Sequence, residues 1–221
     1  MLFLNRFWLY IVNRRTKYTP FSAPAPQKRG HLHPYKIILG FSMASSGFLF
    51  LVMLGLYAVQ RFQVGNPMDA IYIPKAFILS TLVILASSFL LIRAKQHFFK
   101  DEVAQTLRLL AAVFILGLVF STLQIMGWAE LHAHGFHFPD LNVASSYVYV
   151  ITGIHLAHVV MAISLMGYLW YSLYIKSRDP ISRLVMETNP YEKQKFDVVL
   201  GLWHYVDILW VVLFLVFVFT F

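Results

Sequence analysis

The sequence contains no cysteine among its 221 residues. This absence excludes disulfide bonds, iron–sulfur clusters, thiolate metal sites and thiol-based catalysis in this chain. It leaves the redox compartment of the protein open, because a chain without thiols is compatible with either an oxidising or a reducing environment.

Charge is the second scarce property. Charged residues make up 13% of the chain, whereas soluble domains carry about 25%. Hydrophobic residues make up 59%, and the mean hydropathy is +0.65. A soluble protein of this size has too little interior to bury so much apolar surface, so the composition predicts a protein that lies in a lipid bilayer.

Long apolar runs divide the chain into membrane-spanning segments. Each run is long enough to cross a hydrocarbon core of about 30 Å as a helix, and none has a proline in its interior. The sequence therefore predicts an all-α, polytopic membrane protein with five transmembrane helices. The predicted spans are Ile37–Val59, Pro74–Ile92, Leu109–Trp128, Tyr147–Ile175 and Val198–Phe221.

Lysine and arginine are distributed unevenly between the connections. Sixteen of the eighteen lie before the first span, between the second and third, or between the fourth and fifth. Positive residues accumulate on the cytoplasmic side of membrane proteins, so this bias predicts an N-terminus inside and a C-terminus outside. It also explains the net charge of +8 without nucleic acid as a partner.

The first 33 residues are predicted to form a separate segment. The apolar run Phe7–Val12 is short and is flanked by Arg6, Arg14 and Arg15, which is unlike a signal peptide. We expect it to lie on the inner leaflet as an interfacial segment. A linker containing three prolines follows, and residues 34–221 form the membrane domain.

Ionisable residues inside two predicted spans need an explanation, because buried charge is costly in a bilayer. His155 and His158 share one face of the fourth span, and His204 and Asp207 share one face of the fifth. At 1.5 Å per residue, His158 lies about 16 Å below the outer boundary and Asp207 about 13 Å above the inner one. We therefore expect the two helices to pack together, with the histidines of the fourth span facing Asp207 and His204.

Three interpretations of this cluster remain open. The first is a polar latch, in which the side chains hydrogen-bond one another, backbone carbonyls or a lipid. The second is a metal or haem site, since histidine and carboxylate are suitable ligands for zinc, iron and copper. The third is a proton relay, because histidine titrates near neutral pH.

A second group of possible metal ligands lies in the predicted outer loop. It contains Glu130, His132, His134, His137 and Asp140. A His-x-His pair with a further histidine and two carboxylates could bind a metal ion, but we favour a solvated loop without one.

Small residues are concentrated in the first two spans. They allow helix backbones to approach closely in lipid, which is their ordinary structural role. They are Gly40, Ser42, Ala44, Ser45, Ser46 and Gly47 in the first span, and Ser80, Thr81, Ala86, Ser87 and Ser88 in the second.

The last two spans resemble the signature helices of cytochrome oxidase subunit III. The run Leu202–Phe214 (LWHYVDILWVVLF), which includes Trp203 and Trp210, is similar to the closing helix of that family. Thr152–Val159 (TGIHLAHV) resembles its other hallmark, with both histidines present. Weaker matches are Gly40–Phe41, Ser80–Thr81, Ser87–Ser88, and Gln124 with Trp128. The resemblance covers about residues 34–221 and fits the five-helix form of the family.

The resemblance implies a subunit of a proton-pumping haem–copper terminal oxidase in a bacterial inner (plasma) membrane. Haems and copper would lie in partner subunits, with no cofactor in this chain other than an expected phospholipid. Such a subunit packs against catalytic subunit I and helps to sustain proton uptake. His155, His158, Trp203, His204, Asp207 and Trp210 would then form a polar latch or contact lipid. The alternative from the same family is an accessory protein of nitric oxide reductase.

One departure from the family pattern affects the expected role. The family commonly has an acidic residue after a serine in the helix that corresponds to the first span. Here the chain reads Ser45–Ser46–Gly47–Phe48, with no carboxylate between Lys36 and Arg61. The departure favours a stabilising and lipid-binding role over proton conduction. A transporter is disfavoured because no internal repeat or broken helix pair is present.

Overall fold

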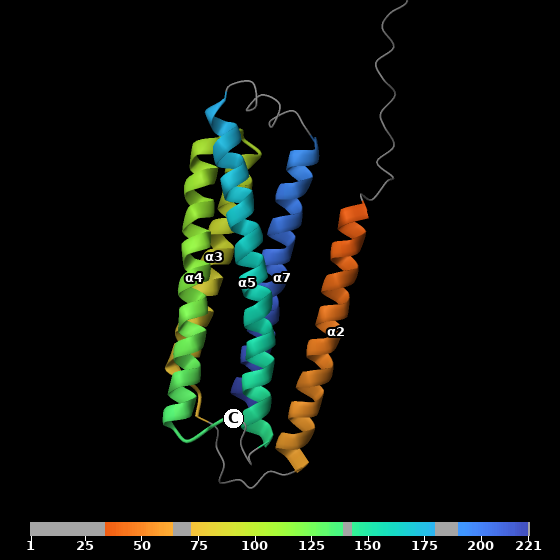
Figure 1. Cartoon of the computed structure of the whole chain (residues 1–221), viewed down its shortest axis with the longest axis vertical. Helices are drawn as coiled ribbons and strands as arrows, with labels where there is room; N and C mark the ends of the chain where they lie inside the picture. Colours follow the sequence, from red (N-terminus) through yellow and green to blue (C-terminus); the bar gives the residue numbers. More distant parts are fainter. Residues whose placement is uncertain (1–33, 64–71, 139–142, 180–189, 221) are drawn as a thin grey trace, which may run out of the picture. The chain divides into compact units, whose positions relative to one another are not determined.

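The described part of the chain is entirely helical in the computed structural model (Figure 1). The structure describes residues 34–63, 72–138, 143–179 and 190–220. These residues form five helices, and no strand occurs among them. The helices are α2 (Pro34–Gln63), α3 (Lys75–Phe98), α4 (Val103–Ala133), α5 (Val143–Arg178) and α7 (Pro190–Thr220).

Prolines mark the starts of three of the helices. Pro34 and Pro190 are the first residues of α2 and α7, where the missing N–H has no helical partner to lose. Pro74 precedes α3 in an extended conformation. A glycine marks the end of α4. Gly135, two residues after the helix, has a φ of +87°, a conformation that favours glycine and ends the helix.

All five helices are long and apolar enough to cross a membrane. This confirms the five predicted spans and the all-α, multi-pass fold. The helices extend beyond the predicted ends, because the polar residues that flank each apolar run continue the helix outside the hydrocarbon. The placement of Glu130 and His132 in a loop is therefore wrong, since α4 continues to Ala133.

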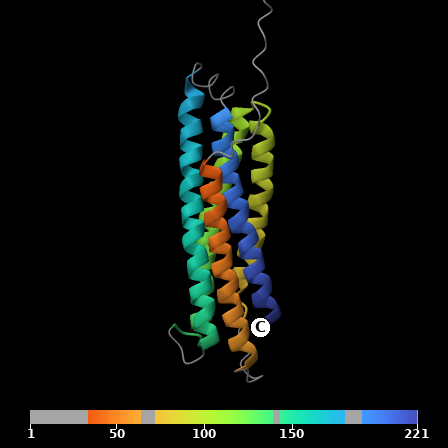
Figure 2. The ribbon, with the colours of Figure 1, turned by 90° about the vertical axis from the view of Figure 1, so that its right-hand side faces the viewer.

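Four of the helices form a closed bundle. Helix α3 packs against α4, α4 against α5, α5 against α7, and α7 against α3. Helix α2 lies beside α5 and α7, as Figures 1 and 2 show from two directions. Helix α2 is less buried than the other four helices. In its most apolar stretch 11% of the residues are buried, compared with 33% to 39% in the others.

Charged side chains connect the helices at one end of the bundle, where α3 and α5 end and α7 begins. Lys95 contacts Asp197 at 3.0 Å and Lys176 contacts Glu192 at 2.7 Å. The direction in which the chain crosses the membrane remains a prediction. The chain divides into two units, Met1–Pro34 and Tyr35–Phe221; the predicted interfacial segment and linker lie outside the described residues.

Candidate functional site

The histidines of α5 point to two different surroundings. His155 is completely buried. Its ring lies 5.2 Å from that of Trp210, 6.0 Å from that of Phe120 and 6.5 Å from that of Phe50, measured between centroids. Neither ring nitrogen has a hydrogen-bond partner in the described structure. His155 therefore fills an aromatic enclosure contributed by α2, α4 and α7.

His158 connects α5 to α2. Its Nδ1 lies 2.8 Å from the carbonyl oxygen of Ile154, and its Nε2 lies 2.8 Å from Ser46 Oγ. A carbonyl only accepts, so in the neutral imidazole Nδ1 carries the proton and Ser46 donates to Nε2. Both nitrogens thus form hydrogen bonds, and the one with Ser46 links α5 to α2.

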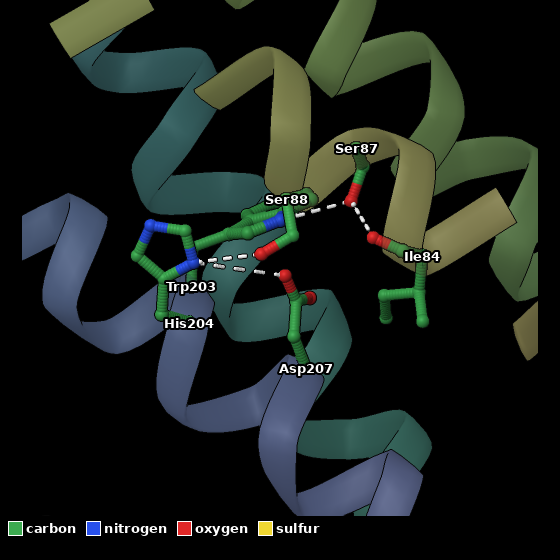
Figure 3. A network of polar contacts seen from close by, with 6 residues as sticks. All are labelled: Ile84, Ser87, Ser88, Trp203, His204 and Asp207. Carbon is green, nitrogen blue, oxygen red and sulfur yellow. Dashed lines mark hydrogen bonds and ion pairs between the residues drawn. The ribbon is translucent and has the colours of Figure 1, made fainter. Parts of the chain in front are cut away.

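His204 and Asp207 of α7 gather around Ser88 of α3 (Figure 3). His204 Nδ1 lies 2.9 Å from Ser88 Oγ and 4.0 Å from a carboxylate oxygen of Asp207. Asp207 is buried, and neither of its oxygens makes a hydrogen bond in the described structure. It borders a cavity of about 10 Å³ that Ser87 and Trp203 also line, which is room for about one water molecule.

The expected hydrogen bonding between the α5 histidines and Asp207 is not formed. The nitrogens of His158 are engaged with α2 and its own helix, and those of His155 have no partner. The helices do pack together, as predicted. However, His158 of α5 turns toward Ser46 of α2, and His204 of α7 turns toward Ser88 of α3. The depth estimate placed the residues at similar heights but carried no information on which way each face turns.

Hydroxyl groups on α3 accept hydrogen bonds from the two tryptophans of α7. Trp203 Nε1 donates to Ser87 Oγ at 3.3 Å, and Trp210 Nε1 donates to Thr81 Oγ1 at 3.0 Å. Ser87 and Thr81 in turn donate their own protons to backbone carbonyls of α3. Each hydroxyl thus satisfies its donor within its own helix and offers an oxygen lone pair to the neighbouring one.

The same arrangement holds α4 to both of its neighbours. Gln124 Nε2 of α4 donates to Ser80 Oγ of α3 at 3.0 Å, and Trp128 Nε1 of α4 donates to Thr152 Oγ1 of α5 at 2.9 Å. Ser80 and Thr152 donate their own protons to carbonyls of α3 and α5. The small residues of the second span were interpreted only as spacers, and their role as acceptors was missed. The signal in the sequence was a hydroxyl group at each of these positions.

The polar cluster has the properties of a structural connection. Ser88 and Asp207 both approach the same nitrogen of His204, so the imidazole does not lie between them as it would in a serine–histidine–aspartate relay. Among the described residues, no group of three or more histidine or acidic side chains is placed to bind a metal ion. What the arrangement does is join α3 and α7 by hydrogen bonds inside the membrane-spanning region.

The predicted outer-loop ligands that the structure describes lie at the end of helix α4 and just beyond it, and they divide into two pairs. Glu130 accepts a hydrogen bond from the backbone N–H of Lys75 at 2.7 Å. His134 stacks on Tyr72 at 3.7 Å, and its Nδ1 lies 2.8 Å from the carbonyl oxygen of Glu130. His132 instead contacts the ring of His137. Asp140 lies outside the described residues, so the predicted absence of a metal there stays a prediction.

A pocket of about 250 Å³ lies between α2 and the pair α5 and α7. Its apolar lining comes from Met43, Ala157, Met161 and Leu202. Its polar lining comes from Ser42, Ser46, His158 and Tyr205. The Tyr205 hydroxyl is buried without a hydrogen-bond partner, and a Cβ at Gly47 would lie 3.4 Å from it. The hydroxyl therefore lies close to the backbone of α2.

Comparison with known proteins places these helices in a known context. The family model described as cytochrome c oxidase subunit III matches residues 62–221, which leaves most of α2 outside the match. The cytochrome c oxidase subunit 3 of Bacillus subtilis (strain 168) is 26% identical over 206 residues, covering 90% of this chain and 94% of that protein.

Two further relatives differ in how much of their length is matched. The cytochrome c oxidase subunit 3 of Bacillus sp. (strain PS3) is 27% identical over 197 residues, covering 87% of this chain and 89% of that protein. The subunit 3 of Struthio camelus is 27% identical over 150 residues, covering 68% of this chain. There the chain spans about half of the relative, 51% of its length.

Proposed function

Because this chain belongs to the cytochrome c oxidase subunit III family, we propose that it is subunit III of a haem–copper terminal oxidase. The relatives are named as oxidase subunits, which favours the oxidase over the nitric oxide reductase alternative. The protein would reside in a bacterial inner membrane, with its N-terminus inside, as the distribution of lysine and arginine indicates. It would associate there with catalytic subunit I and other subunits of the oxidase.

In this proposal the chain supports chemistry that occurs in its partners. The haems and copper would be bound by other subunits, as the resemblance to the family implies. The observation that carries the proposal is the hydrogen-bonded cluster between α3 and α7. It uses the residues that resemble the family signature to fix helix positions, as a polar latch does.

The pocket between α2, α5 and α7 is the place where we propose that lipid binds. Three of its polar residues, Ser46, His158 and Tyr205, lie about 10 Å or more inside their apolar runs at 1.5 Å per residue. A phospholipid headgroup lies outside a hydrocarbon core of about 30 Å. An acyl chain reaches that depth and matches the methionine and leucine lining. Lipid there would fill the space that α2 leaves against the bundle.

Purification of a tagged chain in mild detergent tests the proposed function. We expect a haem–copper catalytic subunit to be recovered with the chain, identified by mass spectrometry, and the haem bands to follow that partner. A chain recovered alone, as a stable monomer, would contradict the proposal. So would a haem band in the spectrum of the isolated polypeptide, because the haem would then belong to this subunit.

The substitution Asp207→Asn separates the polar latch from the proton relay. The amide keeps the shape and polarity of the carboxyl group but does not exchange a proton near neutral pH. For a latch, we expect the assembled oxidase to keep both oxygen consumption and proton ejection in vesicles. Loss of proton ejection in a fully assembled complex would instead show a relay, and Ser164→Ala, which removes an exposed hydroxyl of α5, serves as the control.

A further inference from the structure

One polar side chain of the cluster faces outward from the bundle. His204 is partly exposed, with 31% of its side chain accessible. Its Nδ1 faces Ser88 and Asp207, and Figure 3 shows the other ring nitrogen, Nε2, pointing away from both. The described residues provide no hydrogen-bond partner for Nε2. A polar atom is therefore presented on the surface that α3 and α7 share.

The depth of His204 makes this exposure costly. The residue lies six positions after Val198, where the apolar run of α7 begins, and therefore about 9 Å inside that run at 1.5 Å per residue. Hydrocarbon offers no hydrogen bond at that depth, and lipid headgroups lie beyond a core of about 30 Å. Serine hydroxyls on other exposed faces bond a carbonyl of their own helix, as Ser164 does with Val160 at 2.8 Å. The Nε2 of His204 has no such partner in the described structure.

The surface around His204 is shaped to receive a helix. Gly201 lies one turn before His204 on the same face, and a Cβ placed there would meet nothing within 4 Å. Ile208 continues that face of α7, and Leu85 and Phe89 flank Ser88 on α3. The side chains of Ile208, Leu85 and Phe89 are exposed. A small residue beside a hydrogen-bonding side chain is the combination that brings transmembrane helices into contact.

We propose that this α3/α7 face, defined by Leu85, Ser88, Phe89, Gly201, His204 and Ile208, binds a transmembrane helix of the oxidase catalytic subunit. The partner helix presents a hydrogen-bonding side chain or an exposed backbone carbonyl to His204 Nε2. The inference rests on the proposed function, which supplies the partner. It adds the surface that makes the contact and the chemistry that recognises it.

Glycine substitutions test the face with matched controls. Gly40 and Gly55 of α2 resemble Gly201, because a Cβ at either position also meets nothing within 4 Å. Leucine at any of the three adds bulk to the surface without a clash inside the chain. We expect Gly201→Leu to reduce recovery of the catalytic subunit with the tagged chain by about tenfold or more, equivalent to about 1.4 kcal/mol. Gly40→Leu and Gly55→Leu are expected to leave it unchanged.

Cross-linking provides a readout that does not depend on weakened binding. The chain has no cysteine, so a single introduced thiol carries a photoactivatable maleimide at one known position. Ile208→Cys is expected to cross-link to the catalytic subunit, and Phe41→Cys, on the exposed face of α2, is not. Helical circular dichroism and a monodisperse elution profile establish that each variant is folded.

The possible outcomes separate the docking face from the proposed function. Recovery of the catalytic subunit with every glycine variant, or its loss with Gly40→Leu alone, would overturn the docking face and leave the proposed function intact. Cross-linking of Ile208→Cys to a second copy of this chain would also overturn the face. If the unsubstituted chain recovered no catalytic subunit, both the proposed function and the docking face would be wrong.

Discussion

Helix α2 and the four-helix bundle are equally apolar but are held in place differently. The mean hydropathy of the α2 span is 2.2, the same as that of α3 and α7. However, 11% of the apolar stretch of α2 is buried, compared with 33% for α3 and 39% for α7. Lipid solvates apolar side chains as well as protein does, so a transmembrane helix need not bury them to be stable. Hydropathy therefore identifies a span without indicating how closely it packs.

The glycines show the same contrast at single positions. In the bundle, a Cβ at Gly127 would lie 2.2 Å from the ring of Phe77, and one at Gly117 would lie 2.8 Å from the ring of Trp203. In α2, Gly40 and Gly55 meet nothing within 4 Å. Glycine is thus required for packing at these two bundle positions, whereas these two positions of α2 are open. Three predictions test this contrast, from the largest expected effect to the smallest.

The largest effect is expected from Trp210→Ala. Trp210 is completely buried, lies against Phe77, Phe120 and His155, and bonds Thr81. Removing the indole leaves a large cavity, which costs about 3–5 kcal/mol of unfolding free energy. The measurement is unfolding by added SDS in mixed micelles. Phe219→Ala, at a residue that is 83% exposed, should change little, and equal losses in the two variants would contradict the described core.

An intermediate effect is expected from Gly127→Ala. Phe77 is buried and its ring is fixed against Trp210, so the new methyl group has no space and should destabilise the bundle by about 1–3 kcal/mol. Gly55→Ala is the matched variant and should stabilise α2 by about 0.5–1 kcal/mol, since glycine is a poor helix former. Unfolding in the same micelles measures both. A loss of stability at Gly55 as large as at Gly127 would show that α2 is packed as tightly as the bundle.

The smallest effect is expected from Ser46→Ala. This change removes the hydrogen bond to His158, and such bonds between transmembrane helices contribute about 0.6 kcal/mol on average. Ser42→Ala is the control, because Ser42 lines the same pocket but makes no hydrogen bond to another helix in the described structure. It should change the position of α2 less than Ser46→Ala does. Spin-label distances between α2 and α7 report the position of α2. An unchanged distribution for Ser46→Ala would show that ring contacts alone hold the helix.

Much of the fold could be predicted because it depends on local properties. Apolar length and the absence of interior prolines predicted the five spans. The ends were less accurate, because polar residues such as Glu130 and His132 continue α4 beyond the hydrocarbon. Helix ends outside the core are set by capping and neighbouring contacts, which apolar length does not report.

The candidate site was predicted in its residues but not in its connections. His155, His158, Trp203, His204, Asp207 and Trp210 were identified as special from their positions inside apolar spans. Their partners on other helices, among them Ser46, Thr81, Ser87 and Ser88, were not. A helical period shows which residues share a face, but it does not show which neighbour that face meets.

The sequence by itself thus determined a five-helix membrane protein with polar groups in its last two helices, because those properties belong to single segments. Only the tertiary structure decided that His158 of α5 turns toward α2 while His204 of α7 turns toward α3. That choice depends on the rotation of each helix about its axis. Rotation is set when rings, small residues and hydroxyl groups from different segments fit together, as Phe77 does against Gly127 and Trp210.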